Sequence, residues 1–237
     1  MRRIALIAAL PGELRPLVGG GKAESRGGAR LWRRAAGSGC ELVAACAGMG
    51  PAGAARAFAA AAQTGPFDLV ASVGWAGSLR PDFAPGRVCR LAGVVEAATG
   101  ERFPTDQGGP DGWAVTVAAV AGREEKRRLA AAFGADVVEM EAAEVARQAR
   151  RAGVPFRCLK AVSDGWDEDL PDFGKFIDAG GRIRPGPFAA HVLARPWRWP
   201  ALARLGRRSA RAARALRLAL PGFLLEGADP THGPSAA

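Results

Sequence analysis

The chain has 237 residues and a formal net charge of +10, from 33 lysines and arginines and 23 acidic residues, which suits one α/β domain with a sizeable core. Two histidines argue against a histidine-rich metal site, and four cysteines outside any CxxC spacing predict buried free thiols in a reducing compartment. No apolar run reaches the length of a membrane span, so we expect a cytoplasmic protein with no metal or other cofactor.

The N-terminal residues predict a buried strand that leads into a short helix. Ile4 to Ala9 is apolar, but the run is short for a signal peptide and lacks a small-residue cleavage site after it. The turn into the helix places Glu13 and Arg15 at the carboxyl edge of this strand. A turn-rich loop over 19–28 and paired strands over 29–36 and 40–45 are expected next.

Two glycine-containing segments come next. Residues 48–53, GMGPAG, open an alanine-rich helix that we expect to end near Gln63. A glycine loop before a helix N-terminus can seat an anion or a sugar, but this one lacks the Walker and GxGxxG spacings and is weak by itself. Residues 67–73 predict a strand, and residues 74–78, GWAGS, predict a glycine-flanked turn at its end.

The middle of the chain continues the same sheet. We expect a strand over 88–95, a Pro/Gly-rich surface loop over 100–112, a strand over 114–120 and a helix over 124–132. No linker divides this part of the chain, and no internal repeat is evident.

Residues 136–164, DVVEMEAAEVARQARRAGVPFRCLKAVSD, hold two acidic sites in one unit. Apolar runs at both ends flank a helix-forming segment that Gly153 ends, which predicts strand, helix and strand of a parallel sheet. In such sheets the ligand crevice lies at the carboxyl ends of the strands, where Glu139, Glu141 and Asp164 fall. The alternative is that these acids cap helix N-termini.

The C-terminal part carries most of the net charge. After a turn-rich stretch in which Trp166 and Phe173 either flank a ligand or cover the core, a helix is expected over 187–193. A helix over 201–220 follows, with a leucine face opposite an arginine face; eight arginines and no acidic residue lie between 195 and 217. This helix either packs its leucine face on the domain or lies on anionic lipid.

Four motifs give the chain a resemblance to a known family. They are IALIAALPGEL, AGMGPAGAARA, SVGWAGSL and EMEAAEVARQARRAGVPFRCLKAVSD, in this order over residues 3–180. They resemble the nucleoside phosphorylase family, in particular its methylthioadenosine/S-adenosylhomocysteine nucleosidase branch. VAGREEKRRL and the arginine helix are similar to hopanoid-associated or generic phosphorylases of this family.

The resemblance implies the fold class and the domain organisation. The expected architecture is an α/β, single-domain, phosphorylase-type three-layer fold, in which helices flank a central mixed, largely parallel sheet. We expect the catalytic domain over 1–195, a basic amphipathic helix over 196–226 and a disordered tail over 227–237.

The resemblance also implies a role for each site residue. Asp164, with a pKa raised by burial, would protonate the departing purine near N7. Glu141 would hold the ribose 2′ and 3′ hydroxyls, Met140 would pack against the sugar, and Glu13 would orient the attacking water. The remaining substrate contacts would come from Leu10, Met49, Gly50, Trp75, Ala76, Gly77, Val120, Glu139 and Phe173, with Leu10, Met49 and Phe173 around the 5′ substituent. In a phosphorylase, Arg15 and Gly48 would bind phosphate.

Two positions depart from the family pattern. Trp75 stands where relatives commonly carry a small serine or threonine, and an indole can donate only one hydrogen bond and would narrow the site. The base-side segment VTVAAVAG, residues 115–122, lacks the aromatic residue that stacks on adenine in the nucleosidases. These departures leave the identity of the substrate open.

We expect hydrolytic release of adenine from a purine nucleoside, as in methionine salvage. One alternative is a phosphate-dependent phosphorylase, including one that acts on an adenosyl-lipid of the hopanoid type, with phosphate as co-substrate. Another is a degenerate family member that binds a membrane surface through the arginine helix. We expect a homodimer, no nucleic-acid partner, and a cytoplasmic location with weak contact to the inner membrane face.

Overall fold

One mixed sheet of eleven strands runs through the part of the chain that the computed structural model describes, residues 2–19, 21–36, 39–170, 174–178, 180–182 and 184–225. In chain order the strands are β1 (Arg2–Ala8), β2 (Glu24–Arg26), β3 (Ala29–Ala35), β4 (Cys40–Cys46), β5 (Leu69–Ser78), β6 (Val88–Arg90), β7 (Gly93–Glu96), β8 (Arg102–Pro104), β9 (Trp113–Thr116), β10 (Val137–Glu139) and β11 (Phe156–Asp164). The sheet order is β2-β3-β4-β1-β5-β10-β9-β7-β8, and β11 pairs with both β5 and β6. Parallel pairing joins β4, β1, β5 and β11 at the centre.

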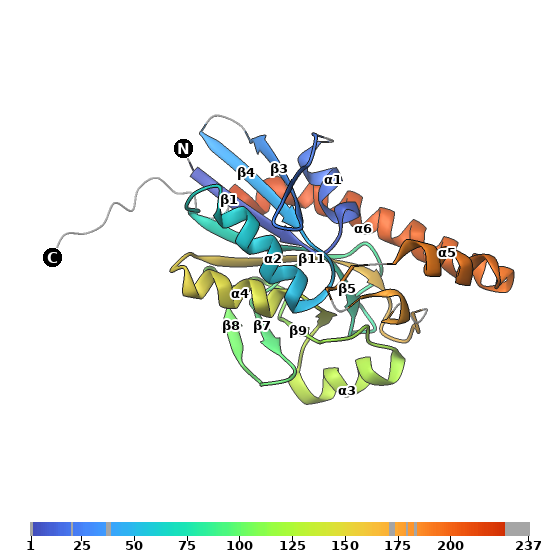
Figure 1. The fold of residues 1–237 in the computed structure, drawn as a ribbon. Coiled ribbons are helices and arrows are strands. Elements are labelled where there is room, and N and C mark those ends of the chain that lie inside the picture. Colours follow the sequence, from blue (N-terminus) through green and yellow to red (C-terminus); the bar gives the residue numbers. More distant parts are fainter. Residues whose placement is uncertain are drawn as a thin grey trace.

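The helices cover both faces of this sheet, which confirms the three-layer α/β fold (Figure 1). They are α1 (Pro11–Val18), α2 (Gly50–Ala62), α3 (Arg123–Phe133), α4 (Ala142–Arg151), α5 (Pro185–Leu193) and α6 (Trp199–Leu225), with short 3-10 turns η1 (Gly174–Phe176) and η2 (Pro196–Arg198). Alternate side chains of β1 point to opposite faces. Ala5 and Ile7 pack in the cluster that contains α2 and α4, whereas Ile4 and Leu6 pack in the cluster that contains α1 and α6.

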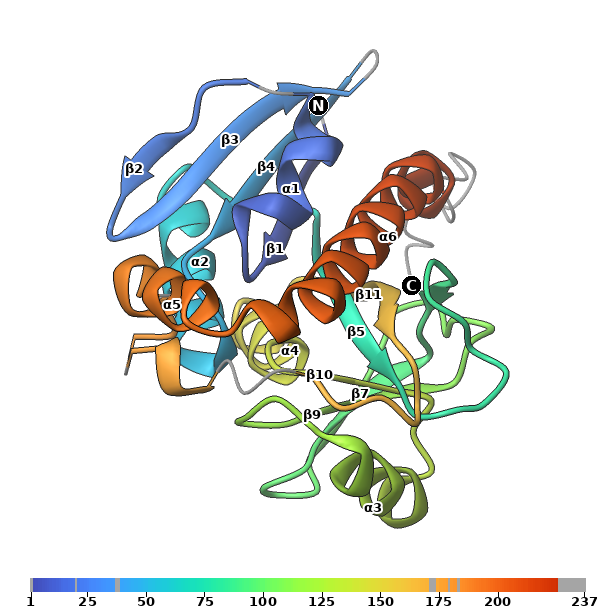
Figure 2. The same cartoon turned by 90° about the vertical axis from the view of Figure 1, so that its right-hand side faces the viewer.

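Helix α6 crosses the sheet face opposite α2 and α4 (Figure 2). Ala212, Leu216 and Leu220 are buried there, and burial of one leucine side chain stabilises a fold by about 1.5–3 kcal/mol. The alternative in which the leucine face packs on the domain is therefore confirmed. Figure 1 shows that α5 and the first part of α6 project beyond the sheet.

The acidic centre departs from the predicted parallel unit. Strand β11 pairs parallel with β5, but β10 pairs antiparallel with the end of β5, so β10 and β11 do not form a parallel crossover. Gly77 on β5 is nevertheless opposite both Val138 and Asp164. Both strands therefore bring their acidic ends to the same place.

Several boundaries also differ from those predicted. The expected turn over 74–78 is the end of β5, because these residues still pair with β11 and β10. The strand expected over 88–95 is two strands, because the chain leaves β11 after β6 and joins β9 with β7. Strands β2 and β8, of three residues each, lie in segments predicted as loops.

Two further expectations concern the cysteines and the membrane. The four thiols are free, with Cys46, Cys89 and Cys158 buried and Cys40 half-buried, so the prediction of buried free thiols is confirmed for three of them. None of the helices in the described ranges combines the length and the apolar character that a membrane crossing needs. The expected disordered tail lies outside the described residues.

Candidate active site

A cavity of about 280 Å³ opens where β1, β5, β10 and β11 end. Most of the side chains predicted from the sequence line it, and they are Leu10, Glu13, Met49, Trp75, Ala76, Gly77, Val120, Glu139, Met140, Glu141 and Asp164. The prediction that the acidic residues gather at the carboxyl ends of the strands is confirmed.

The remaining predicted residues lie beside the cavity or away from it. Gly50 contributes its backbone, because its N–H donates a hydrogen bond to Glu141 Oε1 at 2.7 Å. The N–H of Gly48 donates to Ala9 O at 3.0 Å, and Arg15 is exposed on α1, outside the cavity lining. Phe173 lies outside the described residues.

Glu13 is held by backbone donors from two strand ends. Its Oε2 accepts the N–H groups of Ala9 and Leu10 at 3.0 and 2.7 Å, and its Oε1 accepts the N–H of Trp75 at 2.8 Å. Burial raises the pKa of this carboxyl, and these N–H groups and the charge of Lys160 partly offset the rise. A carboxylate has about four acceptor sites, so one remains for a bound water.

The close approach of Glu13 to β5 requires a glycine. Gly74 has φ of 149°, and a Cβ added there would lie 2.4 Å from Glu13 Oε1. A larger residue at this position would displace the carboxylate from the strand. The glycines of the GWAGS segment therefore serve close packing inside a strand, not a turn.

Glu139 and Glu141 are two residues apart and differ in their surroundings. Glu139 accepts hydrogen bonds from the Thr116 hydroxyl and from the N–H groups of Glu141 and Ala142, and it pairs with Lys160 at 2.9 Å. The alternative of a helix cap therefore holds for Glu139 at the start of α4. Glu141 accepts the N–H of Gly50 and keeps its other acceptor sites for a ligand.

The charges on this side of the cavity are not balanced. Burial, and next the charge of Glu139, raise the pKa of Glu141 to about 8, against the opposing effects of Lys160 and the Gly50 N–H. Burial alone would lower the pKa of Lys160, but the Glu139 carboxylate outweighs it and the pKa is raised. The Glu141 carboxyl therefore keeps its proton to a higher pH than an ordinary glutamate does.

Asp164 also lines the cavity and is paired with a buried lysine. Lys126 Nζ, on α3, is 2.5 Å from Asp164 Oδ2, and the two side chains are 1% and 3% exposed. The Ser163 hydroxyl donates to Asp164 Oδ1 at 2.6 Å. A Cβ added at Gly77 would lie 2.9 Å from Asp164 Oδ2 and 3.1 Å from Lys126 Cε, so the pair needs this glycine as well.

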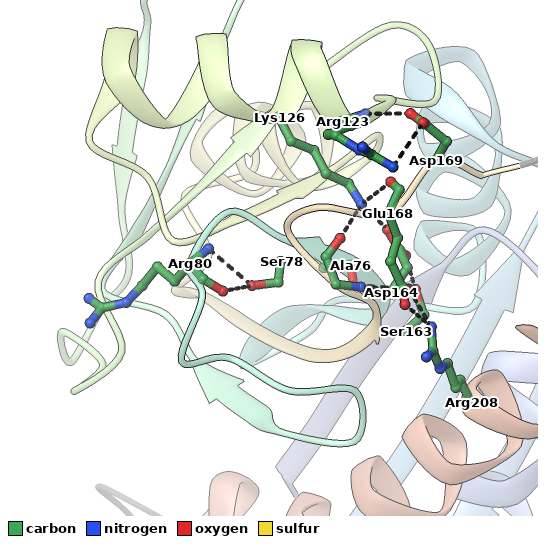
Figure 3. A network of polar contacts seen from close by, with 11 residues as sticks. Ala76, Ser78, Arg80, Arg123, Lys126, Ser163, Asp164, Glu168, Asp169 and Arg208 are labelled. Atoms are coloured by element: carbon green, nitrogen blue, oxygen red, sulfur yellow. Dashed lines mark hydrogen bonds and ion pairs between the residues drawn. The ribbon is translucent and has the colours of Figure 1, made fainter.

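Residues 165–168, which follow β11, lie over the Lys126–Asp164 pair and are joined to α6 by an ion pair. Figure 3 shows Lys126 reaching toward Asp164 and Glu168, with Arg208 on the far side of Glu168. Lys126 Nζ donates to the backbone carbonyls of Gly165 and Glu168 at 2.7 and 3.2 Å. The Glu168 carboxylate forms an ion pair with Arg208 of α6, so that helix helps to position the acidic side of the cavity.

Sequence reasoning missed Lys126, although a signal was present. Lys126, Leu129, Ala130 and Phe133 follow i, i+3, i+4, i+7 spacing, and Lys126 is the charged member of this otherwise apolar row of α3. A charge in an apolar stripe calls for a buried partner. Leu170, Leu205 and Ser209 also line the cavity, and no sequence period predicts that they reach it.

Trp75 lines the cavity and offers a hydrogen-bond donor. Its Nε1 is buried and has no hydrogen-bond partner within the described part of the chain. Buried donors are nearly always satisfied in native proteins, so a bound ligand or water is the expected acceptor.

Comparison with known proteins identifies the family of this chain. The family model described as the phosphorylase superfamily matches residues 3–117 and 97–184. A search of curated protein sequences found no match.

Three solved structures illustrate the likeness of the fold. A 5′-methylthioadenosine/S-adenosyl homocysteine nucleosidase of Helicobacter pylori has a TM-score of 0.70 at 16% identity, covering 95% of this chain and 98% of that chain. The corresponding nucleosidase of S. pneumoniae has a TM-score of 0.69 at 20% identity, covering 94% and 98%. A futalosine hydrolase of Helicobacter pylori has a TM-score of 0.70 at 15% identity, covering 95% and 98%.

Proposed function

The chain belongs to the phosphorylase superfamily, whose enzymes cleave N-glycosidic bonds of nucleosides, and we propose that it releases adenine from an adenine nucleoside with water as the nucleophile. One observation carries this proposal. Glu13, Glu141 and Asp164 line a single cavity although they come from three separate parts of the chain. Cleavage of this bond needs an acid at the leaving base and a base at the nucleophile, and the arrangement supplies both.

Each carboxyl suits one part of a bound nucleoside. Asp164, beside Lys126, faces the purine and serves proton transfer to N7. Glu141 faces the ribose, whose hydroxyl groups are hydrogen-bond donors that favour its ionised form. Glu13 holds the water that attacks C1′, and its raised pKa makes it a stronger base once it is ionised.

The choice of water over phosphate is supported by the charges around the cavity. Among the described lining residues the only cation is Lys126, and Asp164 already neutralises it. The N–H groups of the glycine loop are also occupied, since Gly48 donates to Ala9, Met49 donates to Gly181 and Gly50 donates to Glu141. A phosphate dianion would therefore meet buried glutamates without a free cation, which is unfavourable.

The walls of the cavity favour an apolar 5′ substituent. Leu10, Met49, Leu170 and Leu205 are aliphatic and contribute to its lining. A methylthio group or a longer thioether fits this chemistry better than a free hydroxyl, which would lose hydrogen bonds to water. Methionine salvage is thus a fitting role, and homodimerisation stays a prediction.

The test is adenine release from methylthioadenosine, adenosylhomocysteine and adenosine, with and without phosphate. We expect the two thioether nucleosides to be cleaved faster than adenosine, at rates that do not depend on phosphate. Rates that rise from zero with phosphate concentration would replace this function with phosphorolysis. A protein that releases no base from any of them would be a binding protein on this fold.

A second candidate is favoured by the corner between α5 and α6. Leu193 and Trp197 are 70% exposed and Trp199 is 48% exposed, in a segment that also carries Arg195 and Arg198. Tryptophans with arginines suit a water–lipid boundary. Because α6 also lines the cavity through Leu205, this corner would let the enzyme meet a nucleoside whose 5′ group is a membrane lipid.

Truncation is a poor test of membrane contact, since α6 is part of the core. The better test is co-sedimentation with anionic vesicles of the double variant Trp197→Ala and Trp199→Ala. Leu218→Ala is the matched control, because Leu218 is 67% exposed farther along α6. We expect weak, salt-sensitive binding that the double variant loses and the control keeps. Equal sedimentation of all three proteins would discard this candidate.

A further inference from the structure

Lys126 is a buried ammonium whose three donors are all used. They go to Asp164 Oδ2 at 2.5 Å, to Gly165 O at 2.7 Å and to Glu168 O at 3.2 Å. A lysine ammonium has three N–H groups and no acceptor. Lys126 therefore has no donor left for a substrate and acts on the reaction through Asp164.

Asp164 is bonded at both oxygens. Lys126 donates to Oδ2 and the Ser163 hydroxyl donates to Oδ1, so the carboxyl forms a salt bridge with the lysine. A carboxylate that faces a departing purine has no proton of its own to give. The only proton bound next to it on a titratable group of the described chain is on Lys126.

We propose that Lys126 supplies the proton that Asp164 passes to the departing base. This inference rests on the proposed function, because it concerns the fate of the purine in that reaction. Lys126 is a positioning and proton-holding residue, while Asp164 remains the group that touches the substrate.

The C1′–N9 bond breaks and its electron pair goes to the purine, whose N7 takes a proton from the Asp164 carboxyl. Asp164 receives that proton from the Lys126 ammonium, which becomes a neutral amine, and Asp164 ends as the carboxylate it was. The oxygen of the attacking water bonds to C1′, and the water gives one proton to Glu13. After product release Glu13 returns its proton to solvent and Lys126 takes one from solvent, so that both groups regain their starting states.

The surroundings of Lys126 shield the pair from bulk water. Its side chain is 1% exposed, and the segment 165–168 lies over it. The charged groups that face it are Asp164 from β11 and Glu168 from this segment, and Arg208 of α6 neutralises Glu168. The Lys126 ammonium is thus held directly against Asp164 Oδ2, at a distance that allows a proton to pass between them.

The test compares two substitutions at position 126 in the full chain, with methylthioadenosine as substrate. In Lys126→Arg the cation is kept but the guanidinium does not release its proton, so kcat should fall by about 10²–10⁴-fold at every pH. In Lys126→Met, Asp164 must take its proton from solvent, so kcat should rise with acidification more steeply than in the wild type. Arg123→Met, at the exposed start of the same helix, is the matched control and should keep the wild-type kcat.

The shape of the pH profile separates proton supply from a structural role. If Lys126 only stabilises the fold, both variants would lower kcat, and their plots of kcat against pH would run parallel to that of the wild type. This result would overturn the inference. A Lys126→Arg enzyme with kcat within tenfold of wild type would also overturn it, and this variant decides the matter if Lys126→Met does not fold. A wild-type protein that releases no adenine would instead overturn the proposed function, and this inference with it.

Discussion

The carboxyl groups that line the cavity lie in two different electrostatic settings. Asp164 has its own cation, Lys126, at 2.5 Å. Glu13, Glu139 and Glu141 share one cation among the described residues, Lys160, which pairs directly with Glu139. The charge of Asp164 is therefore matched by its partner, whereas the three glutamates together would carry more negative charge than Lys160 can neutralise.

This difference allows the carboxyl groups to take separate roles in one reaction. A carboxyl paired with a lysine holds a transferable proton without a net charge, which suits a leaving group that becomes anionic. Carboxyls with raised pKa values accept protons readily, which suits activation of water and binding of hydroxyl donors. Variants that remove one carboxyl at a time should therefore fail in different ways.

The largest effect on kcat is expected when Asp164 is replaced. Asp164→Asn removes the group that hands a proton to the purine, so kcat for adenine release should fall by about 10²–10⁴-fold. The amide keeps the size of the side chain, and Tm measured by calorimetry should show a folded protein. Near-normal release of adenine by this variant would remove Asp164 from the reaction.

Glu13→Gln should give the next largest loss. The amide can still contact backbone groups but cannot accept the proton of the attacking water, and we expect kcat to fall by about 10²-fold with KM little changed. Glu24→Gln, on the exposed strand β2, is the control. If Glu13→Gln instead raised KM and kept kcat, Glu13 would be a binding residue for the 5′ side.

Glu141→Gln should act on binding and turnover together. Loss of one charge-assisted hydrogen bond to a ribose hydroxyl lowers kcat/KM by about 10–100-fold. Substrates without the 2′ hydroxyl should then lose little further activity in this variant. A variant that still discriminates ribose from deoxyribose as the wild type does would show that Glu141 does not hold this hydroxyl.

The residues changed in these three variants could all be predicted from the sequence. The acidic ends of the predicted strands pointed to Glu13, Glu141 and Asp164, because parallel strands place their carboxyl ends at one edge. The direction of β10 could not be foreseen, since it depends on how the end of β5 pairs. Lys126 was not predicted because α3 contains many charged residues, and only tertiary packing determines which of these side chains is buried.

The role of α6 was likewise undecided until its packing was known. The spacing of Leu216 and Leu220 predicts an apolar face, but this pattern fits a lipid surface and a sheet equally well. The structure buries both residues against the sheet. The sequence contains no local signal that Arg208 would face Glu168, because the two lie forty residues apart.

The smallest expected effect is on stability, and it tests only the electrostatic setting of Glu141. Because the pKa of Glu141 is raised to about 8, the folded protein keeps a proton that the unfolded chain loses near pH of about 4.3. This contribution to stability is full below that lower value and is lost as the pH rises through the folded pKa. Glu141→Gln should therefore flatten the fall in unfolding free energy between about pH 5 and about pH 8, by roughly 1–3 kcal/mol.

Urea unfolding at several pH values measures this slope. Equal slopes for wild type and Glu141→Gln would mean that Glu141 is ionised in the folded protein at neutral pH. Glu141 would then be ionised like Asp164, and the electrostatic difference on which we base their separate roles would not exist.

The central claim, that water attacks the nucleoside in this cavity, is tested most directly by following the oxygen. Methylthioadenosine is incubated with the wild-type protein in heavy-oxygen water that also contains phosphate, and the sugar product is weighed by mass spectrometry. The expected product is free methylthioribose that carries the heavy oxygen at C1′, with adenine released in equal amount. A methylthioribose phosphate without the label, or no adenine at all, would contradict the claim.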